Sequence, residues 1–331
     1  MAGNVWVLAE HWRSKISDIT YELLALGKEV ATNIGAELQA VLLGHEVREL
    51  AQSLGAANSV LYLDHVALAN PVPESFAQAL ASAIRARKPR AILIPLTNVS
   101  WEIGTLLAAQ LEVGYINACK DVRLVEGKLQ VRSVLYGGKM EALVNPAQST
   151  AILGILPGAR PADHGRAATV PMLEEVTVDL AETSSVQLKR YLEPEPGDID
   201  ISKQEVLVSV GRGIQSRENV RLAEELAGAL GGAVCGSRPV IDQGWLPLSR
   251  QVGKSGAVVK PKLYVAAGIS GAPEHVEGMK NSDLIIAINS DPQAPIFNVA
   301  RYGITADAID VLPALTEMVR SRKKEAKSRA A

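Results

Sequence analysis

Four turns in the second half of the chain combine glycine or small residues with polar side chains directly after short apolar runs. The four are Gly211-Arg212-Gly213, Gly236-Ser237-Arg238, the stretch from Gly268 to His275, and Asn289. Glycine lets backbone N–H groups approach an anion closely, and serine, arginine, histidine and asparagine side chains can donate further hydrogen bonds. These residue types favour a site for a phosphate-bearing ligand.

The stretch "KLYVAAGISGAPEHVEGMK", residues 262–280, shows the pattern best. Its first residues are typical of a buried strand, and Gly268 and Gly271 remove side-chain bulk where that strand would end. Pro273 is suited to the start of a helix. Because the carboxyl ends of parallel strands meet at one edge of a sheet, where ligands of open α/β proteins bind, we expect the four turns to converge there.

Hydrolytic and metal-dependent chemistry fit the sequence poorly. His275 has no cysteine or second histidine at ligand spacing, and neither Ser237 nor Ser270 lies in the GxSxG context of an activated nucleophile. The "VGKSG" run at 252–256 lacks the earlier glycine of a P-loop, because Leu248 stands in its place. For His275, a hydrogen-bonded structural histidine is the alternative to a ligand contact.

Length and composition favour a two-domain protein that binds neither nucleic acid nor membrane. The 331 residues are 47% hydrophobic and 21% charged, and the formal net charge is -2. Cys119 and Cys235 form no CxxC pair, so neither a disulfide framework nor a zinc site is expected. No apolar run is long enough to cross a bilayer and no signal peptide is recognisable, so we expect a cytoplasmic protein without direct membrane insertion.

Strand and helix patterns alternate in the first half, which predicts a parallel sheet covered on both faces. The expected strands are "VWVLAE", "LQAVLLG", "SVLYLD" and "AILIPL". Apolar residues at helical spacing run from Ile19 to Ile34, with Asp18 as the expected N-cap and Gly35 as the stop. From Tyr115 to about Leu156 the alternation of apolar and polar residues with glycines between predicts antiparallel hairpins.

The acidic, proline-containing stretch "YLEPEPGDIDISK", residues 191–203, is the expected linker between domains 1–190 and 204–331. The alternation restarts after it, with expected strands that include "EVLVSV", "AVCG", "KLYVAA", "DLIIAIN" and "AIDVLP". A terminal helix is expected to begin at Pro313. The predicted fold class is therefore α/β with two domains, an N-terminal parallel-sheet domain with antiparallel hairpins and a C-terminal Rossmann-like domain.

The second half resembles the α subunit of electron transfer flavoprotein. The resemblance covers Val206 to about Pro313 and rests on the ordered segments "SVGRGI", "GSRPVIDQGW", "QVGKSG", "PKLYVAAGISGAPEHVEGMK", "IIAINSDPQAPIF" and "ARYGITAD". The first half is similar to the N-terminal domain of the same family through "VWVLAE", "GAELQAVLLG" and "LYGGKMEALV". The resemblance implies that the second domain binds FAD and that the first domain serves as a subunit interface.

The resemblance also implies which residues contact FAD. Arg212 matches the arginine of the first glycine turn, and Ser237 and Arg238 match a Ser-Arg pair beside the isoalloxazine and the neighbouring phosphate region. A loop that usually reads VGQT corresponds here to Val252, Gly253, Lys254 and Ser255. Within this loop, the serine keeps a hydroxyl where the family has a threonine near flavin N5.

A second group of implied contacts follows the expected strand at 263–267. It consists of Ser270, Gly271, Ala272, Pro273, Glu274 and His275, and the family's histidine approaches the pyrimidine oxygen of the flavin. Asn289 and Asp307 match residues that hold the adenosine end. Lys254 replaces the usual glutamine and Pro273-Glu274 replace the usual Ile-Gln, so the flavin potential of other members does not transfer to this chain.

The implied function is that of an electron carrier rather than a catalytic enzyme. The chain would be the FAD-binding α subunit of a heterodimer with an electron transfer flavoprotein β subunit. It would take electrons from a donor flavin dehydrogenase, such as an acyl-CoA dehydrogenase, and pass them to an acceptor such as a quinone oxidoreductase. Arg238 and His275 would stabilise negative charge on the reduced flavin.

Three alternatives stay open at this point. The chain could belong to an NADH-dependent electron-bifurcating complex, whose distinguishing residues would lie mostly on the partner. It could be a sirtuin-like deacylase, although the two isolated cysteines count against the zinc site that such enzymes usually carry. It could also be a nucleotide-binding module without a redox function.

Overall fold

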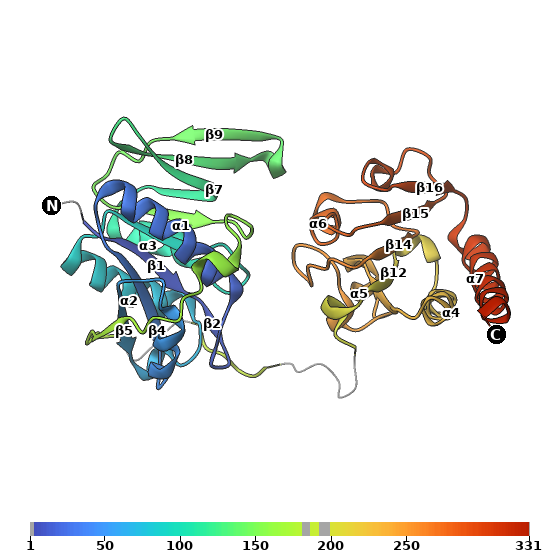
Figure 1. The fold of residues 1–331 in the computed structure, drawn as a ribbon, viewed down its shortest axis with the longest axis horizontal. Coiled ribbons are helices and arrows are strands. Elements are labelled where there is room, and N and C mark those ends of the chain that lie inside the picture. The colour runs from blue at the N-terminus through green and yellow to red at the C-terminus, as the bar shows by residue number, and fades with distance from the viewer. Residues whose placement is uncertain (1–2, 181–185, 192–198, 331) are drawn as a thin grey trace. The chain divides into compact units, whose positions relative to one another are not determined.

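The structure is a computed structural model that describes residues 3–180, 186–191 and 199–330. The chain forms two compact units, Met1–Tyr191 and Leu192–Ala331 (Figure 1). The central part of the predicted linker, 192–198, lies outside the described residues. Its first residue, Tyr191, packs edge-on against Trp12 of the first unit, and Ile201 is buried in the core of the second.

A nine-stranded sheet forms the centre of the first unit, in the order β11-β5-β4-β1-β6-β10-β7-β8-β9. Neighbouring strands from β11 to β7 are parallel, whereas β8 pairs antiparallel with β7 and with β9. This arrangement confirms the predicted parallel strands and hairpins. The strands are β1 (Val5–Ala9), β4 (Leu38–Gly44), β5 (Ser59–Asp64), β6 (Ala91–Pro95), β7 (Tyr115–Val125), β8 (Lys128–Leu135), β9 (Met140–Val144), β10 (Ala151–Ile155) and β11 (Met172–Glu175), with β2 (His11–Trp12) and β3 (Lys15–Ile16) in a separate hairpin.

Helices cover both faces of the parallel part of this sheet, which explains why its central strands are continuous apolar runs. Helix α1 (Asp18–Ile34) packs on one face, and α2 (Pro73–Arg87) and α3 (Ile103–Leu111) pack on the other. The prediction of Asp18 as N-cap is wrong by one residue, because Asp18 is already helical and Ser17 precedes it in an extended conformation. Gly35 ends the helix with a φ of 66°, as predicted.

The second unit contains five parallel strands in the order β13-β12-β14-β15-β16. Counted along the chain this order is 2-1-3-4-5, so the direction of winding reverses between β12 and β14. The strands are β12 (Val206–Val210), β13 (Ala233–Gly236), β14 (Leu263–Ala267), β15 (Ile285–Asn289) and β16 (Tyr302–Thr305).

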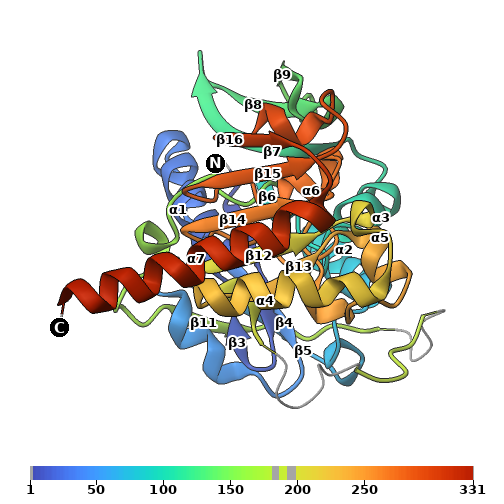
Figure 2. The same ribbon diagram turned by 90° about the vertical axis from the view of Figure 1, so that its right-hand side faces the viewer.

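The two faces of this second sheet are covered differently. Helices α4 (Val220–Leu230) and α7 (Ala308–Ala330) lie side by side over one face (Figure 2). The other face is covered by short helix α6 (Pro273–Glu277) and by irregular segments that bury Val252 and Ile296. Helix α5 (Arg238–Asp242) follows β13.

Two predictions near the C-terminus are wrong. Residues 308–313 are not a strand, because α7 begins at Ala308 and has Pro313 inside it. The carboxylate of Asp307 accepts a hydrogen bond from the amide of Ile309 at 3.0 Å and so fixes the start of the helix there. The fifth strand is β16, which sequence patterning misses because all four of its residues are exposed at the sheet edge.

Candidate functional site

The turns after β12 and β14 lie in direct contact at the point where the winding of the second sheet reverses. The amide of Gly213 donates to the carbonyl oxygen of Gly268 at 3.0 Å, and the amide of Gly211 donates to the carbonyl oxygen of Ala267 at 2.8 Å. Gly268 has a φ of +65°, in the left-handed region. This reversal point is where open α/β sheets bind ligands.

Three backbone amides beside this contact are left for a ligand. Within the described part of the chain, no acceptor takes the amide hydrogens of Ser270, Gly271 or Ala272. Gly271 is buried, so its unpaired amide is costly unless another group accepts from it. Consecutive backbone N–H groups of this kind form concavities that bind anions.

The need for glycine at position 271 comes from packing. Gly271 has a φ of +87°, and a Cβ atom there would lie 2.3 Å from the amide nitrogen of Ile296. The amide of Ile296 also donates to the carbonyl oxygen of Ser270 at 3.0 Å. The glycine therefore allows two protein segments to meet, and its amide is free because the segments meet through other groups.

The loop at 252–255 is tied to two neighbouring turns. The amide of Val252 donates to the carbonyl oxygen of Gly236 at 2.9 Å, and the amide of Lys254 donates to the carbonyl oxygen of Glu274 at 2.8 Å. Ser255 accepts a hydrogen bond from the side-chain amide of Gln251 at 3.0 Å. The side chains of Lys254 and Ser255 remain exposed, so the loop offers a cation and a hydroxyl from a fixed backbone.

His275 is buried under this loop with both ring nitrogens occupied. Its Nδ1 lies 3.1 Å from the carbonyl oxygen of Val252, and its Nε2 lies 3.0 Å from the hydroxyl of Tyr264. Burial lowers the pKa of His275 to about 4. The geometry is that of the structural alternative, and donation from His275 to a flavin stays a prediction that would require one of these partners to be released.

Positive charge at this edge comes from exposed side chains. Arg212 lies in the turn after β12 and Arg238 begins α5, and both are exposed, like Lys254. The Arg238 Nε lies 3.5 Å from Asp242 Oδ2, a solvent-exposed pair that holds the guanidinium weakly. Ser237 is buried as the N-cap residue of α5, although its side chain makes no capping hydrogen bond.

Asn289 and Asp307 connect neighbouring turns at the same edge. The side-chain amide of Asn289 donates to the carbonyl oxygen of Ile269 at 2.8 Å. The carboxylate of Asp307 accepts from the side-chain amide of Gln215 at 3.1 Å. The structure thus places every residue predicted for the site along one edge of the sheet.

Sequence reasoning did not select Gln215, Gln251 or Tyr264, all of which contact predicted site residues. The two glutamines stand in turns without a distinctive spacing. Tyr264 lies within an apolar strand pattern, and only the placement of its hydroxyl separates it from an ordinary core residue.

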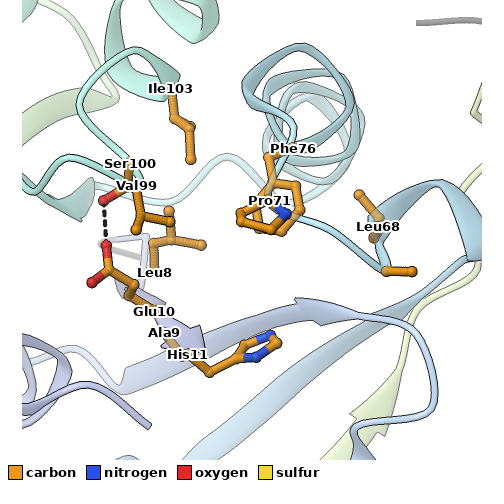
Figure 3. Close-up of a pocket in the computed structure, with 11 residues that line it drawn as sticks. Leu8, Ala9, Glu10, His11, Leu68, Pro71, Phe76, Val99, Ser100 and Ile103 are labelled. Atoms are coloured by element: carbon orange, nitrogen blue, oxygen red, sulfur yellow. Dashed lines mark hydrogen bonds between the residues drawn. The ribbon is translucent and has the colours of Figure 1, made fainter. Parts of the chain in front are cut away.

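The first unit has a small cavity at its own reversal point, between the ends of β1 and β6. Figure 3 shows Glu10 and Ser100 at one side of it, where the Ser100 hydroxyl donates to the Glu10 carboxylate at 2.7 Å. The cavity has a volume of about 20 Å³, which is room for one water molecule and far too little for a dinucleotide.

Two further searches cover only the described residues. Within those ranges, no group of three or more His, Cys, Asp or Glu side chains could hold a metal ion. No helix in the same part of the chain is both long and apolar enough to cross a membrane.

A parallel sheet with glycine turns, free amides and cations at its carboxyl edge defines a nucleotide-binding α/β protein. A family model described as "Electron transfer flavoprotein FAD-binding domain" matches residues 200–280, and one described as "Electron transfer flavoprotein domain" matches residues 5–181. The chain belongs to the electron transfer flavoprotein α-subunit family, and it is a FAD-binding subunit that functions in electron transfer.

Similar proteins match over almost the whole chain. "Protein FixB" of Clostridium saccharobutylicum is 35% identical over 94% of this chain and 95% of its own length. "Electron transfer flavoprotein subunit alpha" of Clostridium acetobutylicum is 34% identical over 96% of this chain and 97% of its own length. "Lactate dehydrogenase (NAD(+),ferredoxin) subunit LctC" of Acetobacterium woodii is 32% identical over 96% of this chain and 77% of its own length.

Proposed function

We propose that this chain holds FAD at the carboxyl edge of its five-stranded sheet and acts as the α subunit of a heterodimeric electron carrier. The observation that carries the proposal is the set of three unpaired backbone amides at 270–272, next to the contact between Gly213 and Gly268. Amides in this arrangement fit the oxygens of a pyrophosphate. The exposed cations nearby fit the remaining negative charge of the dinucleotide.

When bound, FAD supplies the redox centre that takes up and releases electrons. In this proposal Ser270, Gly271 and Ala272 hold its pyrophosphate through their amides. Arg212 and Arg238 neutralise charge, and the loop at 252–255 presents Lys254 and the Ser255 hydroxyl toward the flavin. Asn289 and Asp307 keep their predicted place near the adenosine end. Because the cations are exposed, solvent and salt weaken their effect on the cofactor.

The first unit offers a surface for a partner chain. Its antiparallel hairpins expose large apolar side chains that a solvated surface does not need: Leu135, Tyr136, Met140 and Leu143. We assign this surface to the electron transfer flavoprotein β subunit. A donor flavin dehydrogenase, such as an acyl-CoA dehydrogenase, and an acceptor such as a quinone oxidoreductase complete the proposed pathway in the cytoplasm.

The amide of Ala272 gives a direct test, because this residue has a φ of -53° that proline can adopt. Ala272→Pro removes one of the three amide hydrogens, whereas Ala272→Ser keeps it. Loss of a hydrogen bond to a charged group, about 1.5–3 kcal/mol, predicts FAD affinity about tenfold to a hundredfold lower for the proline variant of the purified heterodimer. Equal FAD affinity of the two variants, with both folded, would overturn the proposed site.

The second candidate function is electron bifurcation with NADH. The observation that favours it is the similarity to the subunit LctC, whose printed name includes NAD(+) and ferredoxin. In that case the β subunit would hold a second FAD. Flavin content of the purified heterodimer separates the two, since one FAD per heterodimer indicates the simple carrier. Two FAD together with reduction by NADH would indicate bifurcation.

A further inference from the structure

Tyr264, His275 and Val252 form a buried chain of hydrogen bonds beneath the 252–255 loop. The Tyr264 hydroxyl is 3.0 Å from His275 Nε2, and His275 Nδ1 is 3.1 Å from the Val252 carbonyl oxygen. Tyr264 is completely buried, and His275 and Val252 are almost so. Water therefore cannot replace either partner easily, and each hydrogen bond contributes more than it would at the surface.

The direction of both hydrogen bonds follows from the carbonyl group. A carbonyl oxygen can only accept, so His275 must carry a hydrogen on Nδ1. In a neutral imidazole the other nitrogen, Nε2, is then an acceptor, and the Tyr264 hydroxyl must donate to it. Burial lowers the pKa of His275 to about 4 and raises that of Tyr264 well above its usual value, so both groups are neutral near pH 7.

We propose that Tyr264 is a positioning residue for the flavin loop, which it holds by fixing His275 in the Nδ1–H tautomer that clamps the Val252 carbonyl. The next residues along the chain, Gly253 to Ser255, then start from a fixed point. The amide of Lys254 is held separately on Glu274. This inference rests on the proposed FAD site, because the loop matters to redox function only where a flavin lies against it.

The phenol is the group that specifies the clamp, because nothing else on the described chain donates to His275 Nε2. Without that donor, the buried nitrogen would favour the other tautomer, which would turn a lone pair on Nδ1 toward the Val252 oxygen. Two acceptors would then face one another and the carbonyl would move away. The loop would shift although no residue in it had changed.

The test uses the FAD-loaded heterodimer with Tyr264→Phe, which keeps the ring and removes only the hydroxyl. Nitrogen-15 NMR of labelled histidine reports the tautomer of His275, with the assignment taken from the spectrum of the His275→Gln variant. We expect a single Nδ1–H tautomer in the unsubstituted protein and its loss in the phenylalanine variant. We also expect the midpoint potential of the bound flavin to shift while FAD content stays the same.

Two variants separate positioning from a general loss of packing. Tyr62→Phe removes the hydroxyl of another buried tyrosine, one that accepts from the amide of Val47 in the first unit, and should leave the flavin potential unchanged. His275→Gln can donate to the Val252 oxygen and accept from Tyr264, so it should restore the potential that His275→Leu shifts.

Three results would overturn the proposal. One is an unchanged tautomer in Tyr264→Phe, and another is an unchanged potential in that variant. The third is a His275 resonance in the unsubstituted protein that shows an Nε2–H tautomer when FAD is bound, as direct donation to the flavin requires. A heterodimer that lacks FAD but shows the Nδ1–H tautomer would instead contradict the proposed function and leave the hydrogen-bond chain standing.

Discussion

A Cβ atom on Gly211 would lie 2.2 Å from the carbonyl oxygen of Gly268. The two residues belong to the turns that follow β12 and β14, the strands between which the winding of the second sheet reverses. A side chain at Gly211 would push these turns apart, because the backbone carbonyl cannot rotate away as a flexible side chain could. The ligand edge therefore depends on a contact that only glycine permits.

We predict that Gly211→Ala lowers the free energy of unfolding of the second unit by about 1–3 kcal/mol, the cost of overpacking. Gly228→Ala is the matched control, because a Cβ atom there would contact nothing within 4 Å in the middle of α4. That control should stabilise the protein by about 0.5–1 kcal/mol. Urea unfolding measures both, and equal stability of the two variants would show that the turns can separate without cost.

Arg238→Ala should lower the midpoint potential of the bound flavin. The guanidinium pairs only loosely with Asp242, at 3.5 Å, so it is available to stabilise negative charge on the reduced cofactor. Loss of a charge-assisted hydrogen bond worth about 1.5–3 kcal/mol corresponds to tens of millivolts in a one-electron couple. A dithionite titration measures the shift, and Arg217→Ala, another exposed arginine, is the control. A potential equal to that of the unsubstituted protein would remove Arg238 from the site.

Lys254→Gln should also lower the potential, and the difference should shrink as salt is added. The Lys254 backbone is held on Glu274 at 2.8 Å, so the substitution removes charge without releasing the loop. Screening lengths fall from about 30 Å at 0.01 M salt to about 8 Å at 0.15 M, and an exposed ammonium is screened strongly. Measurement at both ionic strengths decides the matter, since no difference at low salt would assign Lys254 to the solvated surface.

Stability should fall below pH 6.5 partly because of His275. Its pKa is about 4 in the folded protein, below its usual value near 6.5, so the unfolded chain binds a proton that the folded protein rejects. The stabilising contribution is complete above about pH 6.5 and is lost as the pH falls toward 4. Over that range the loss is on the order of 3 kcal/mol.

His275→Gln should flatten this part of the stability profile, because glutamine does not titrate. Urea unfolding of both proteins at several pH values between 4 and 8 supplies the comparison. Parallel profiles for the variant and the unsubstituted protein would mean that His275 is protonated in the folded state.

Asp307→Ala should destabilise the start of α7. The carboxylate accepts from the amide of Ile309 and from the side chain of Gln215, and loss of an N-cap costs about 1 kcal/mol. Asp307→Asn, which can still cap, should lose much less. If both variants match the unsubstituted protein in thermal unfolding, the cap does not stabilise the helix.

The sequence was informative where a physical rule has a local signature. Continuous apolar runs identified β1, β4, β5 and β6, and glycine turns after strands located the ligand edge. The start of α7 was misread because Pro313 is a strong local signal, whereas the capping carboxylate of Asp307 is an ordinary one. β16 was missed because an exposed edge strand has no burial pattern to read.

The role of His275 shows what sequence could not supply. Its position after a glycine turn suggested a ligand contact, but hydrogen bonds to Tyr264 and Val252 depend on residues 11 and 23 positions away in sequence. Such partners meet only once the sheet and the loop have folded together. The residue that donates to His275 therefore became visible only in three dimensions.

A crystal structure of the FAD-loaded heterodimer is the measurement that tests the central claim most directly. The account predicts FAD on this chain, with pyrophosphate oxygens accepting from the amides of Ser270, Gly271 and Ala272, and with the flavin against the 252–255 loop. FAD bound only to the partner chain, or elsewhere on this chain while those three amides face solvent, would contradict it.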